Sequence, residues 1–408
     1  MEYRRLDWQE LPLKKVISVI GDHRGRTPPK LTAGKYRVFS AKNIKTGRIV
    51  AEDTIGYFDD ELYAKYVRLE LKRGDIIITS EAPFGEIFYW DSDEKAALSQ
   101  RLFSVRIKDE FCAKFIYYYM TYEEFQSELA RRSCGTTVLG LRQPELLKCL
   151  IRFPPLPTQR KIAKVLSAYD DLIENNTKRI RILERMAEEL YKEWFVRFRF
   201  PGHEKAKFVN GLPEGWRESR CGEVIDFDPM TRVDRGRQLT MVPMAALSTK
   251  MMSLDASQFT IVENASGSKF RNGDTLLAKI TPCLENGKTA YVYGLDEGEV
   301  AVGSTEFVVM RGREIGPRLC YCIARSDWFR AIAIGSMSGA DGRQRVKVEK
   351  LRQAVISLPS NELLEKFESV LSPMFNEVEK LTSQNALLAR QRDLLLPRLM
   401  SGKLSVES

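Results

Sequence analysis

Residues 162–194 read IAKVLSAYDDLIENNTKRIRILERMAEELYKEW, and this stretch decides the fold. Its apolar residues recur at alternating spacings of four and three, which is typical of a helix that buries a narrow seam against another helix. Adding 205 to each number gives a second stretch, residues 367–399, with the same spacing. We therefore predict two long helices. Their seam positions are Ile162, Leu166, Tyr169, Ile173, Asn176, Ile180, Leu183, Ala187, Leu190 and Trp194, and Phe367, Leu371, Met374, Val378, Leu381, Asn385, Leu388, Arg392, Leu395 and Leu399.

The repeat also covers the segments that precede the helices. Trp8 reappears as Trp216, at an offset of 208, and Gly74-Asp75 reappears as Gly273-Asp274, at an offset of 199. Residues 151–154 match residues 356–359, where the offset is again 205. An offset that drifts in the middle and recovers at the ends indicates two duplicated globular modules whose loops have diverged.

We predict an α+β fold, with two mixed α/β domains joined by two long helices that form an antiparallel coiled coil with pseudo-two-fold symmetry. The first domain covers residues 1–157 and the first helical spacer 158–200; the second domain covers 201–359 and the second spacer 360–408. Short apolar runs between turn residues predict strands. We expect strands at 67–71, 75–79, 86–90, 102–107, 275–278, 288–293 and 306–310, helices at 113–131 and 318–332, an N-cap at Thr158, and a kink or helix end at Pro397.

The two seams can pair with each other in antiparallel register. If their ends are aligned, Ile162 faces Leu399, Trp194 faces Phe367, and Asn176 faces Asn385. These are the only two asparagines in the seams, and a buried amide pair would fix the register at some cost in stability. The alternative is that each Asn faces solvent. A paired rod of 33 residues would span roughly 50 Å at 1.5 Å per residue.

The composition favours a polyanionic partner in a reducing compartment. Lys and Arg outnumber Asp and Glu by 64 to 55, which gives a net charge of +9, although a basic balance alone is a weak signal. The seven cysteines are scattered without disulfide or zinc spacing, and Cys320 and Cys322 fit a buried helix better than a metal site. The chain contains two histidines and no apolar run long enough to span a bilayer. We expect a cytoplasmic protein that contacts no membrane.

Several motifs resemble those of type I restriction-modification specificity subunits. They are the turn Arg24-Gly25-Arg26-Thr27-Pro28-Pro29 and residues 153–162, 270–280 and 395–404, in this order and partly in duplicate. The resemblance covers essentially the whole chain. The second module departs from it, because residues 231–237 replace the Arg-Gly-Arg-Thr-Pro turn.

The resemblance implies a DNA-binding subunit whose two target recognition domains each read one part of a bipartite site in double-stranded DNA. It also implies that the helices dock two methyltransferase subunits, and that restriction subunits join the full complex. S-adenosylmethionine, ATP and Mg²⁺ would then be used by the partner subunits, with no cofactor bound by this chain.

Base readout needs long donors and amides on loops, whereas phosphate contacts need only cations and backbone amides. A merely solvated basic loop is an equally good interpretation of each candidate taken alone. The candidates in the first module are His23, Arg24, Arg26, Lys30, Lys42, Asn43, Lys45, Arg142 and Gln143. Those in the second module are Arg232, Arg235, Arg237, Lys279, Lys288, Arg343, Gln344 and Arg345, of which the stretch 339–345 is the best because its glycines can present two guanidiniums and an amide together.

Two other classes of function stay open. A self-contained DNA modification or restriction enzyme is disfavoured, because Asp228-Pro229-Met230 lacks the second proline and the aromatic residue of a methyltransferase site, and Gly287-Lys288-Thr289 lacks the upstream glycine of a phosphate-binding loop. A coiled-coil adaptor that binds only protein is disfavoured by the paired basic modules. We therefore expect a subunit that is not itself an enzyme.

Overall fold

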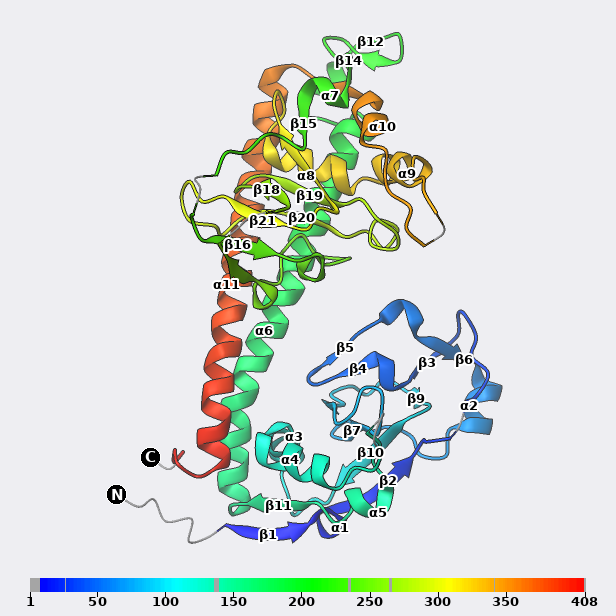
Figure 1. Ribbon diagram of the computed structural model, residues 1–408. Coiled ribbons are helices and arrows are strands. Elements are labelled where there is room, and N and C mark those ends of the chain that lie inside the picture. The colour runs from blue at the N-terminus through cyan, green and yellow to red at the C-terminus, as the bar shows by residue number, and fades with distance from the viewer. Residues whose placement is uncertain are drawn as a thin grey trace. The chain divides into compact units, whose positions relative to one another are not determined.

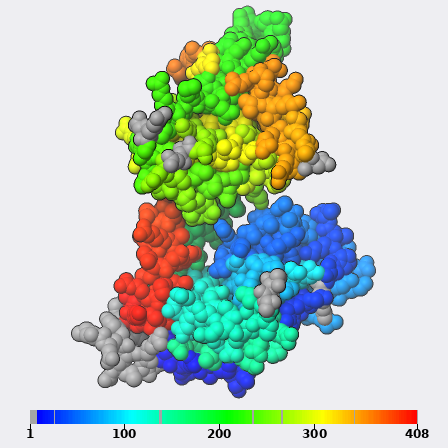
Figure 2. Space-filling view, viewed as in Figure 1, coloured from blue at the N-terminus to red at the C-terminus, as the bar shows by residue number. Residues whose placement is uncertain are grey.

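The chain, described here from a computed structural model, divides into two units. The model describes residues 8–25, 27–135, 139–233, 236–263, 266–340 and 342–406. The first unit comprises Met1–Ile173 and Leu387–Ser408, and the second comprises Glu174–Ala386. Each unit therefore holds one globular module together with part of each of two long helices, and within a unit the module forms a continuous packed surface (Figure 2).

The first module is built on a four-stranded antiparallel sheet with the strand order β2-β10-β7-β8 (Figure 1). The apolar strand β7 is buried along its whole length, which explains its continuous Ile-Ile-Ile run. A three-stranded sheet, β6-β3-β9, pairs β3 with β9 in parallel. The strands are β1 (Gln9–Pro12), β2 (Ile17–Asp22), β3 (Tyr36–Phe39), β4 (Ile44–Lys45), β5 (Arg48–Ile49), β6 (Gly56–Phe58), β7 (Ile76–Thr79), β8 (Ile87–Tyr89), β9 (Ala96–Leu98), β10 (Leu102–Ile107) and β11 (Leu150–Phe153).

The second module repeats this plan. Its four-stranded sheet has the order β15-β22-β19-β20, and its other sheet, β17-β16-β21-β18, again contains one parallel pair, β16 with β21. The pairing of β14 with β23 matches that of β1 with β11. The duplication predicted from the sequence is thus confirmed, although the sheet with the parallel pair has three strands in the first module and four in the second. The strands are β12 (Phe208–Val209), β13 (Leu212–Pro213), β14 (Arg217–Arg220), β15 (Ile225–Phe227), β16 (Leu239–Val242), β17 (Thr260–Val262), β18 (Ser268–Phe270), β19 (Thr275–Ala278), β20 (Thr289–Tyr291), β21 (Ala301–Gly303), β22 (Phe307–Gly312) and β23 (Val355–Leu358).

The short helices differ from the prediction at one point in each module. The helix expected at 113–131 is broken at Tyr122 into α3 (Ala113–Thr121) and α4 (Glu123–Arg131), and the one expected at 318–332 is broken at Ser326 into α8 (Pro317–Arg325) and α9 (Asp327–Gly335). At each break the chain turns, and the first helix of each pair, α3 or α8, packs on the four-stranded sheet. The strand predicted at 67–71 was wrong, since this segment has no regular structure. The remaining helices are α1 (Leu13–Val16), α2 (Asp60–Tyr66), α5 (Gln143–Leu146), α7 (Cys221–Val224) and α10 (Val348–Gln353).

The two long helices are α6 (Leu156–Tyr191) and α11 (Asn361–Met400). The first begins two residues before the predicted N-cap, with Pro157 in its opening turn, where a proline costs no hydrogen bond. The second continues past Pro397, and Leu399 is buried in the core of the first unit. The predicted helix end at Pro397 was therefore wrong, because apolar burial on both sides of the proline outweighs one lost backbone bond.

The helices pair in the predicted antiparallel register. In the second unit the Asn176 Nδ2 atom donates to Asn385 Oδ1 at 3.0 Å and to Gln384 Oε1 at 3.1 Å. The rings of Trp194 and Phe367 lie 5.2 Å apart, as the same register requires. The alternative of two solvent-facing asparagines is excluded for Asn176, which is buried. A buried amide layer thus interrupts the seam, which also carries the charged Arg392.

In the first unit the module is tied to both long helices through one carboxylate. The Tyr118 hydroxyl donates to Asp170 Oδ2 at 2.5 Å, and Arg392 donates to Asp170 Oδ1, also at 2.5 Å. Asp170 lies on α6 and Arg392 on α11, so the three side chains hold three helices together. Because the pair is largely shielded from water, it is stronger than an ion pair on an open surface.

The sheets β2-β10-β7-β8 and β15-β22-β19-β20 carry the same buried ion pair. In the first module both carboxylate oxygens of Asp75 accept from Arg106 at 2.8 Å. In the second, those of Asp274 accept from Arg311 at 2.7 Å. Both aspartates are almost fully buried. This is the physical reason for the repeated Gly-Asp: the glycine makes the turn at positive φ, and the aspartate anchors the central strand to its neighbour.

Each unit has its own large hydrophobic core. One cluster joins the first sheet with α3, α4, the start of α6 and the end of α11, and another joins the second sheet with α8, α9 and the remaining helix segments. Cys320 and Cys322 lie inside α8 and are buried, as predicted. Among the described residues, no helix combines the length and apolarity that crossing a membrane requires.

Candidate nucleic-acid interface

The segment after β2 carries the first group of predicted DNA contacts. The Arg24 guanidinium donates to both oxygens of Asp22 and to the carbonyl of Leu141 at 3.0 Å. Burial opposes the effect, but these bonds lower the pKa of Asp22 and keep the pair charged. His23 contacts the Ser104 hydroxyl at 3.1 Å and lines a cavity of about 360 Å³ with Tyr66. Arg24 is therefore rigidly placed, and Arg26 lies outside the described residues.

Three lysines and an asparagine of the first module have separate roles. Lys30 is an exposed residue, yet partial burial of its ammonium group and the charge of Lys42 lower its pKa, so the structure brings these two cations together. Lys45 forms an ion pair with Glu86 at 2.6 Å. Asn43 is fully buried; its carboxamide accepts from Ser40 and donates to Ala51 and Thr54. The role of Asn43 is thus to shape the loop, and we correct its assignment as a DNA contact.

Arg142 and Gln143 lie where α5 begins. Arg142 is exposed and precedes the first turn, and Gln143 is half-buried as its first residue. The position at a helix N-terminus adds backbone N–H groups that favour phosphate. The helix is only four residues long, so this contribution is small.

In the second module the structure joins two segments, around Ile280 and Arg345, that lie 65 residues apart in the sequence. A β-bridge pairs Ile280 with Arg345, and the Val346 amide donates to the Lys279 carbonyl. The Arg345 guanidinium binds Glu306 in bidentate fashion, and together with the charge of Lys279 it lowers the pKa of Glu306. Lys279 and Arg345 therefore form one basic site around Glu306, with the half-buried Gln344 beside it.

The remaining candidates of the second module differ in how far they are already used. Lys288 donates to the Met244 carbonyl at 2.8 Å, which is a structural contact. Arg232, Arg237 and Arg343 are exposed, and within the described part of the chain no hydrogen bond or ion pair is recorded for their guanidiniums. These three are the side chains most available to DNA. Arg235 lies outside the described residues.

Sequence reasoning missed a cavity of about 490 Å³ in the second module. It is lined by residues 230–232, 271–272 and 296–300 and by Arg311, so it includes the predicted contact Arg232 together with Arg271, Asp296 and Glu297. The repeated Gly-Asp, here Gly273-Asp274, was the sequence signal closest to this cavity, since Arg271 directly precedes that turn. The facing acidic loop carries no signal in the sequence alone, because short acidic loops are usually solvated.

The amino-acid sequence matches known proteins over most of its length. Residues 5–185 match the family Methylase_S, described as type I restriction modification DNA specificity domain. The type I restriction enzyme MjaIX specificity subunit of Methanocaldococcus jannaschii is 26% identical over 344 residues, which cover 82% of this chain and 78% of that protein. The type I restriction enzyme EcoAI specificity subunit of Escherichia coli is 34% identical over 143 residues, covering 33% of this chain and 24% of that protein.

The fold has also been seen before. The crystal structure of a type I restriction-modification system S subunit from M. genitalium superposes with a TM-score of 0.59 at 16% identity, covering 98% of both chains. This likeness concerns the architecture of two modules and two long helices. Together with the sequence matches in both halves, it agrees with the resemblance that the motifs suggested. The chain is similar in sequence and in fold to the specificity subunits of type I restriction-modification systems.

Proposed function

We propose that each module of this DNA-recognition subunit reads one half of a two-part DNA site. The observation that carries the proposal is the duplicated strand order, combined with different basic side chains on the equivalent loops. A duplicated scaffold with unlike loops gives two readers of similar shape and different sequence preference. The domain limits given above, with modules at 1–157 and 201–359, are part of this proposal.

The DNA contacts that we propose are chosen by whether each basic side chain is exposed or already bound within the protein. In the first module Lys30, Lys42 and Arg142 are exposed, and in the second Arg232, Arg237 and Arg343 are. Arg24 and Arg345 are already bound by carboxylates and are therefore held in a fixed position. Such a guanidinium can read a base edge when it leaves its carboxylate or binds the carboxylate and the base at the same time. We assign the exposed cations to phosphates and the held guanidiniums to bases.

We further propose that the long helices set the distance between the half-sites and dock methyltransferase subunits. Several large apolar side chains on these helices are exposed although their neighbours are charged: Ile182 by 57% and Met186 by 46% on α6, and Leu387 by 59% and Leu394 by 62% on α11. Ile182 and Met186 are four residues apart and share one helix face. Such a face fits a partner protein better than DNA. Methyl transfer with S-adenosylmethionine, and any ATP- and Mg²⁺-dependent restriction, are then carried out by the partners.

The proposal is tested by expressing the chain with its cognate methyltransferase subunit in cells that lack other DNA methylation, and sequencing the methylated positions. We expect one motif made of two defined parts separated by a fixed number of unread bases. The methyltransferase expressed alone is the control and should leave no such motif. A methylated motif without an internal gap, or the same motif in the control, would refute the proposal.

A further inference from the structure

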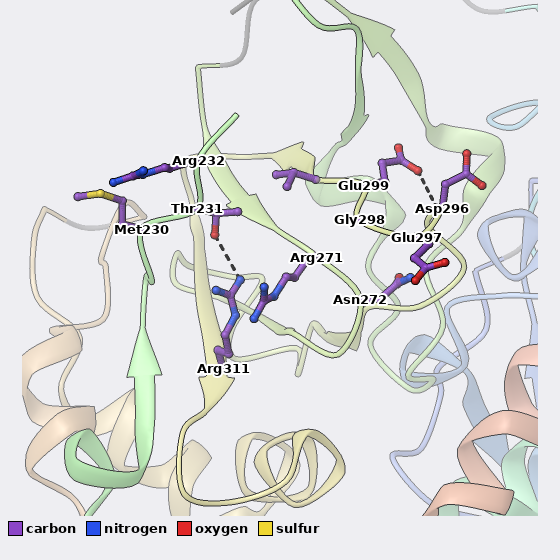
Figure 3. A pocket seen from close by; sticks show the side chains of 11 residues that line it. Met230, Thr231, Arg232, Arg271, Asn272, Asp296, Glu297, Gly298, Glu299 and Arg311 are labelled. Carbon is purple, nitrogen blue, oxygen red and sulfur yellow. Dashed lines mark hydrogen bonds between the residues drawn. The ribbon is translucent and has the colours of Figure 1, made fainter. Parts of the chain in front are cut away.

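The cavity of the second module has two walls of opposite charge. Arg271 lies on one side and the carboxylates of Asp296 and Glu297 lie on the loop opposite, while Arg232 lines the rim on the arginine side with its side chain extending outward (Figure 3). Among the described residues, no carboxylate oxygen lies within the 4.0 Å of an ion pair from the guanidinium of Arg232 or Arg271. The two walls are therefore close enough to line one cavity but do not neutralise each other.

The floor of the cavity, by contrast, is fixed. Arg311 is bound to Asp274 and donates to the Thr231 hydroxyl at 3.2 Å. The Asn272 side chain donates to the carbonyl of Leu295 and accepts from its amide, which pins the acidic loop in place. The charged groups that have no partner thus project from a rigid frame, and little side-chain or loop ordering has to accompany binding.

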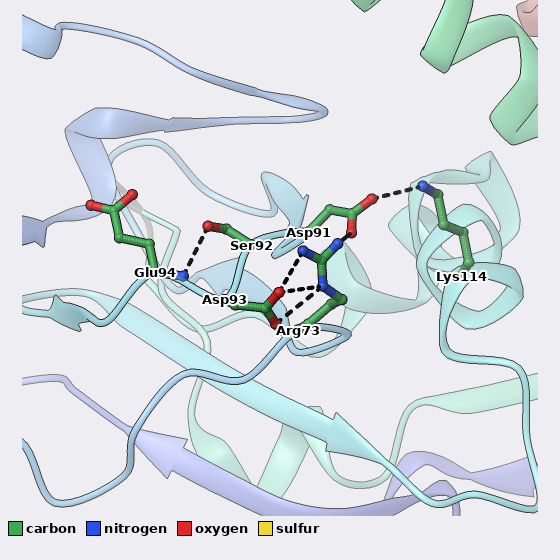
Figure 4. A network of polar contacts seen from close by, with 6 residues as sticks. All are labelled: Arg73, Asp91, Ser92, Asp93, Glu94 and Lys114. Carbon is green, nitrogen blue, oxygen red and sulfur yellow. Dashed lines mark hydrogen bonds and ion pairs between the residues drawn. The ribbon is translucent and has the colours of Figure 1, made fainter.

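The first module provides an internal comparison, because its equivalent loop is closed by its own ion pairs. The backbone match is direct: Trp90 bonds to Asp75 and Gly74 as Val292 bonds to Asp274 and Gly273. The residue before the glycine is Arg73 in the first module. It binds Asp91 at 2.5 Å and Asp93 at 2.8 Å (Figure 4).

The second module has Asn272 where the first has Arg73. The neutral amide leaves the loop carboxylates without a cation, although two arginines stand across the cavity. Exposed carboxylates on a DNA-binding surface repel phosphates, so their presence weakens binding to any sequence. They improve recognition only where they accept a hydrogen bond from an amino group of a base.

From this arrangement we propose that the cavity reads a G·C base pair of the DNA half-site. The guanine edge in the major groove presents two acceptors, O6 and N7, which suit a guanidinium, and the paired cytosine presents an amino group, which suits a carboxylate. Arg271 donates to guanine, and Asp296 or Glu297 accepts from cytosine. No other base pair offers two acceptors beside a donor in this order. The inference rests on the proposed function and specifies what this site recognises.

The test is the methylation motif of two variants, Arg271→Gln and Glu297→Gln, each expressed as the full chain with its methyltransferase subunit. Both residues are exposed, so the fold should be retained, and a thermal unfolding curve checks this. We expect the preference at one G·C position, in one half of the motif only, to fall about tenfold or more. The matched control is Arg73→Gln in the first module, which should leave every position of the motif unchanged.

Two results would overturn the inference. Variants that keep the full preference at every G·C position show that the cavity reads no base. A uniform loss of methylation at all sites, without a change of motif, shows that the arginines contact only phosphates. If the unaltered chain yields no two-part motif, the proposed function fails first and the inference fails with it, so the two failures can be told apart.

Discussion

The buried amide layer between the long helices should act as one energetic unit. Asn176 is 4% exposed and its Nδ2 atom makes two hydrogen bonds, at 3.0 and 3.1 Å. Replacing it by leucine removes both bonds and leaves the Asn385 oxygen facing an apolar side chain. At about 0.5–1.5 kcal/mol for each bond, the free energy of unfolding should fall by about 1–3 kcal/mol.

Asn385→Leu alone should have a similar or smaller cost, because Asn385 is half-buried and its amide also reaches Thr177 at 3.4 Å. The double variant Asn176→Leu/Asn385→Leu restores an apolar seam and should recover most of the loss, since replacing both partners of a buried polar pair is nearly neutral. The coupling energy should therefore be about 1–2 kcal/mol.

The assay is urea unfolding of the three variants and the unaltered chain, followed by circular dichroism at a helix-sensitive wavelength, which weights the two long helices. Asn175→Leu, the same substitution at the neighbouring exposed position, serves as the control and should change the free energy by less than about 0.5 kcal/mol. Single effects that simply add in the double variant, to within about 0.5 kcal/mol, would refute the idea that the pair fixes the register.

Three further predictions concern the second unit, in which Glu184 lies on α6. Arg311→Met leaves Asp274 buried and unpaired, so it should destabilise the protein by about 3–5 kcal/mol, which a thermal unfolding curve measures; an effect below about 1 kcal/mol contradicts the role of this pair. Burial raises the pKa of Glu184 to about 7. The folded state then binds a proton that the unfolded state has released, so stability should fall as the pH rises from about 4.5 through 7. Glu184→Gln should flatten this slope, and an unchanged pH profile speaks against it. Arg343→Ala should lower the slope of log affinity against log salt concentration by about one for all DNA sequences. Lys279→Ala, measured in the same titration, shows whether the basic site around Glu306 contributes to DNA binding. If neither substitution alters the affinity for DNA, these loops are not in the interface.

The sequence was most informative where one physical rule dominates. The seam spacing predicted both long helices and their register, because burying an apolar stripe requires that periodicity over many turns. Periodicity could not locate the break at Tyr122, since the apolar pattern continues through it. Local propensity was also misleading at Pro397, where tertiary burial of Leu399 keeps the helix going.

The candidate DNA interface was harder to predict from the sequence than the fold. A pattern of basic residues identifies cations but not the carboxylates that hold them. Arg24 with Asp22 could have been suspected from their spacing, whereas Arg345 with Glu306 depends on a fold contact across 39 residues. Asn43 was misassigned because a buried loop amide and a base-reading amide look alike in sequence. The cavity of the second module became visible only when the two copies of the loop were compared in three dimensions.

The most direct test of two independent readers is to exchange one module. Residues 201–359 would be replaced by the corresponding module of a related specificity subunit with a known motif, and methylated positions would be sequenced with the same methyltransferase. We predict that one half of the motif changes to that of the donor, while the other half and the gap stay as they were. A motif that changes in both halves, or loses its gap, would contradict the account.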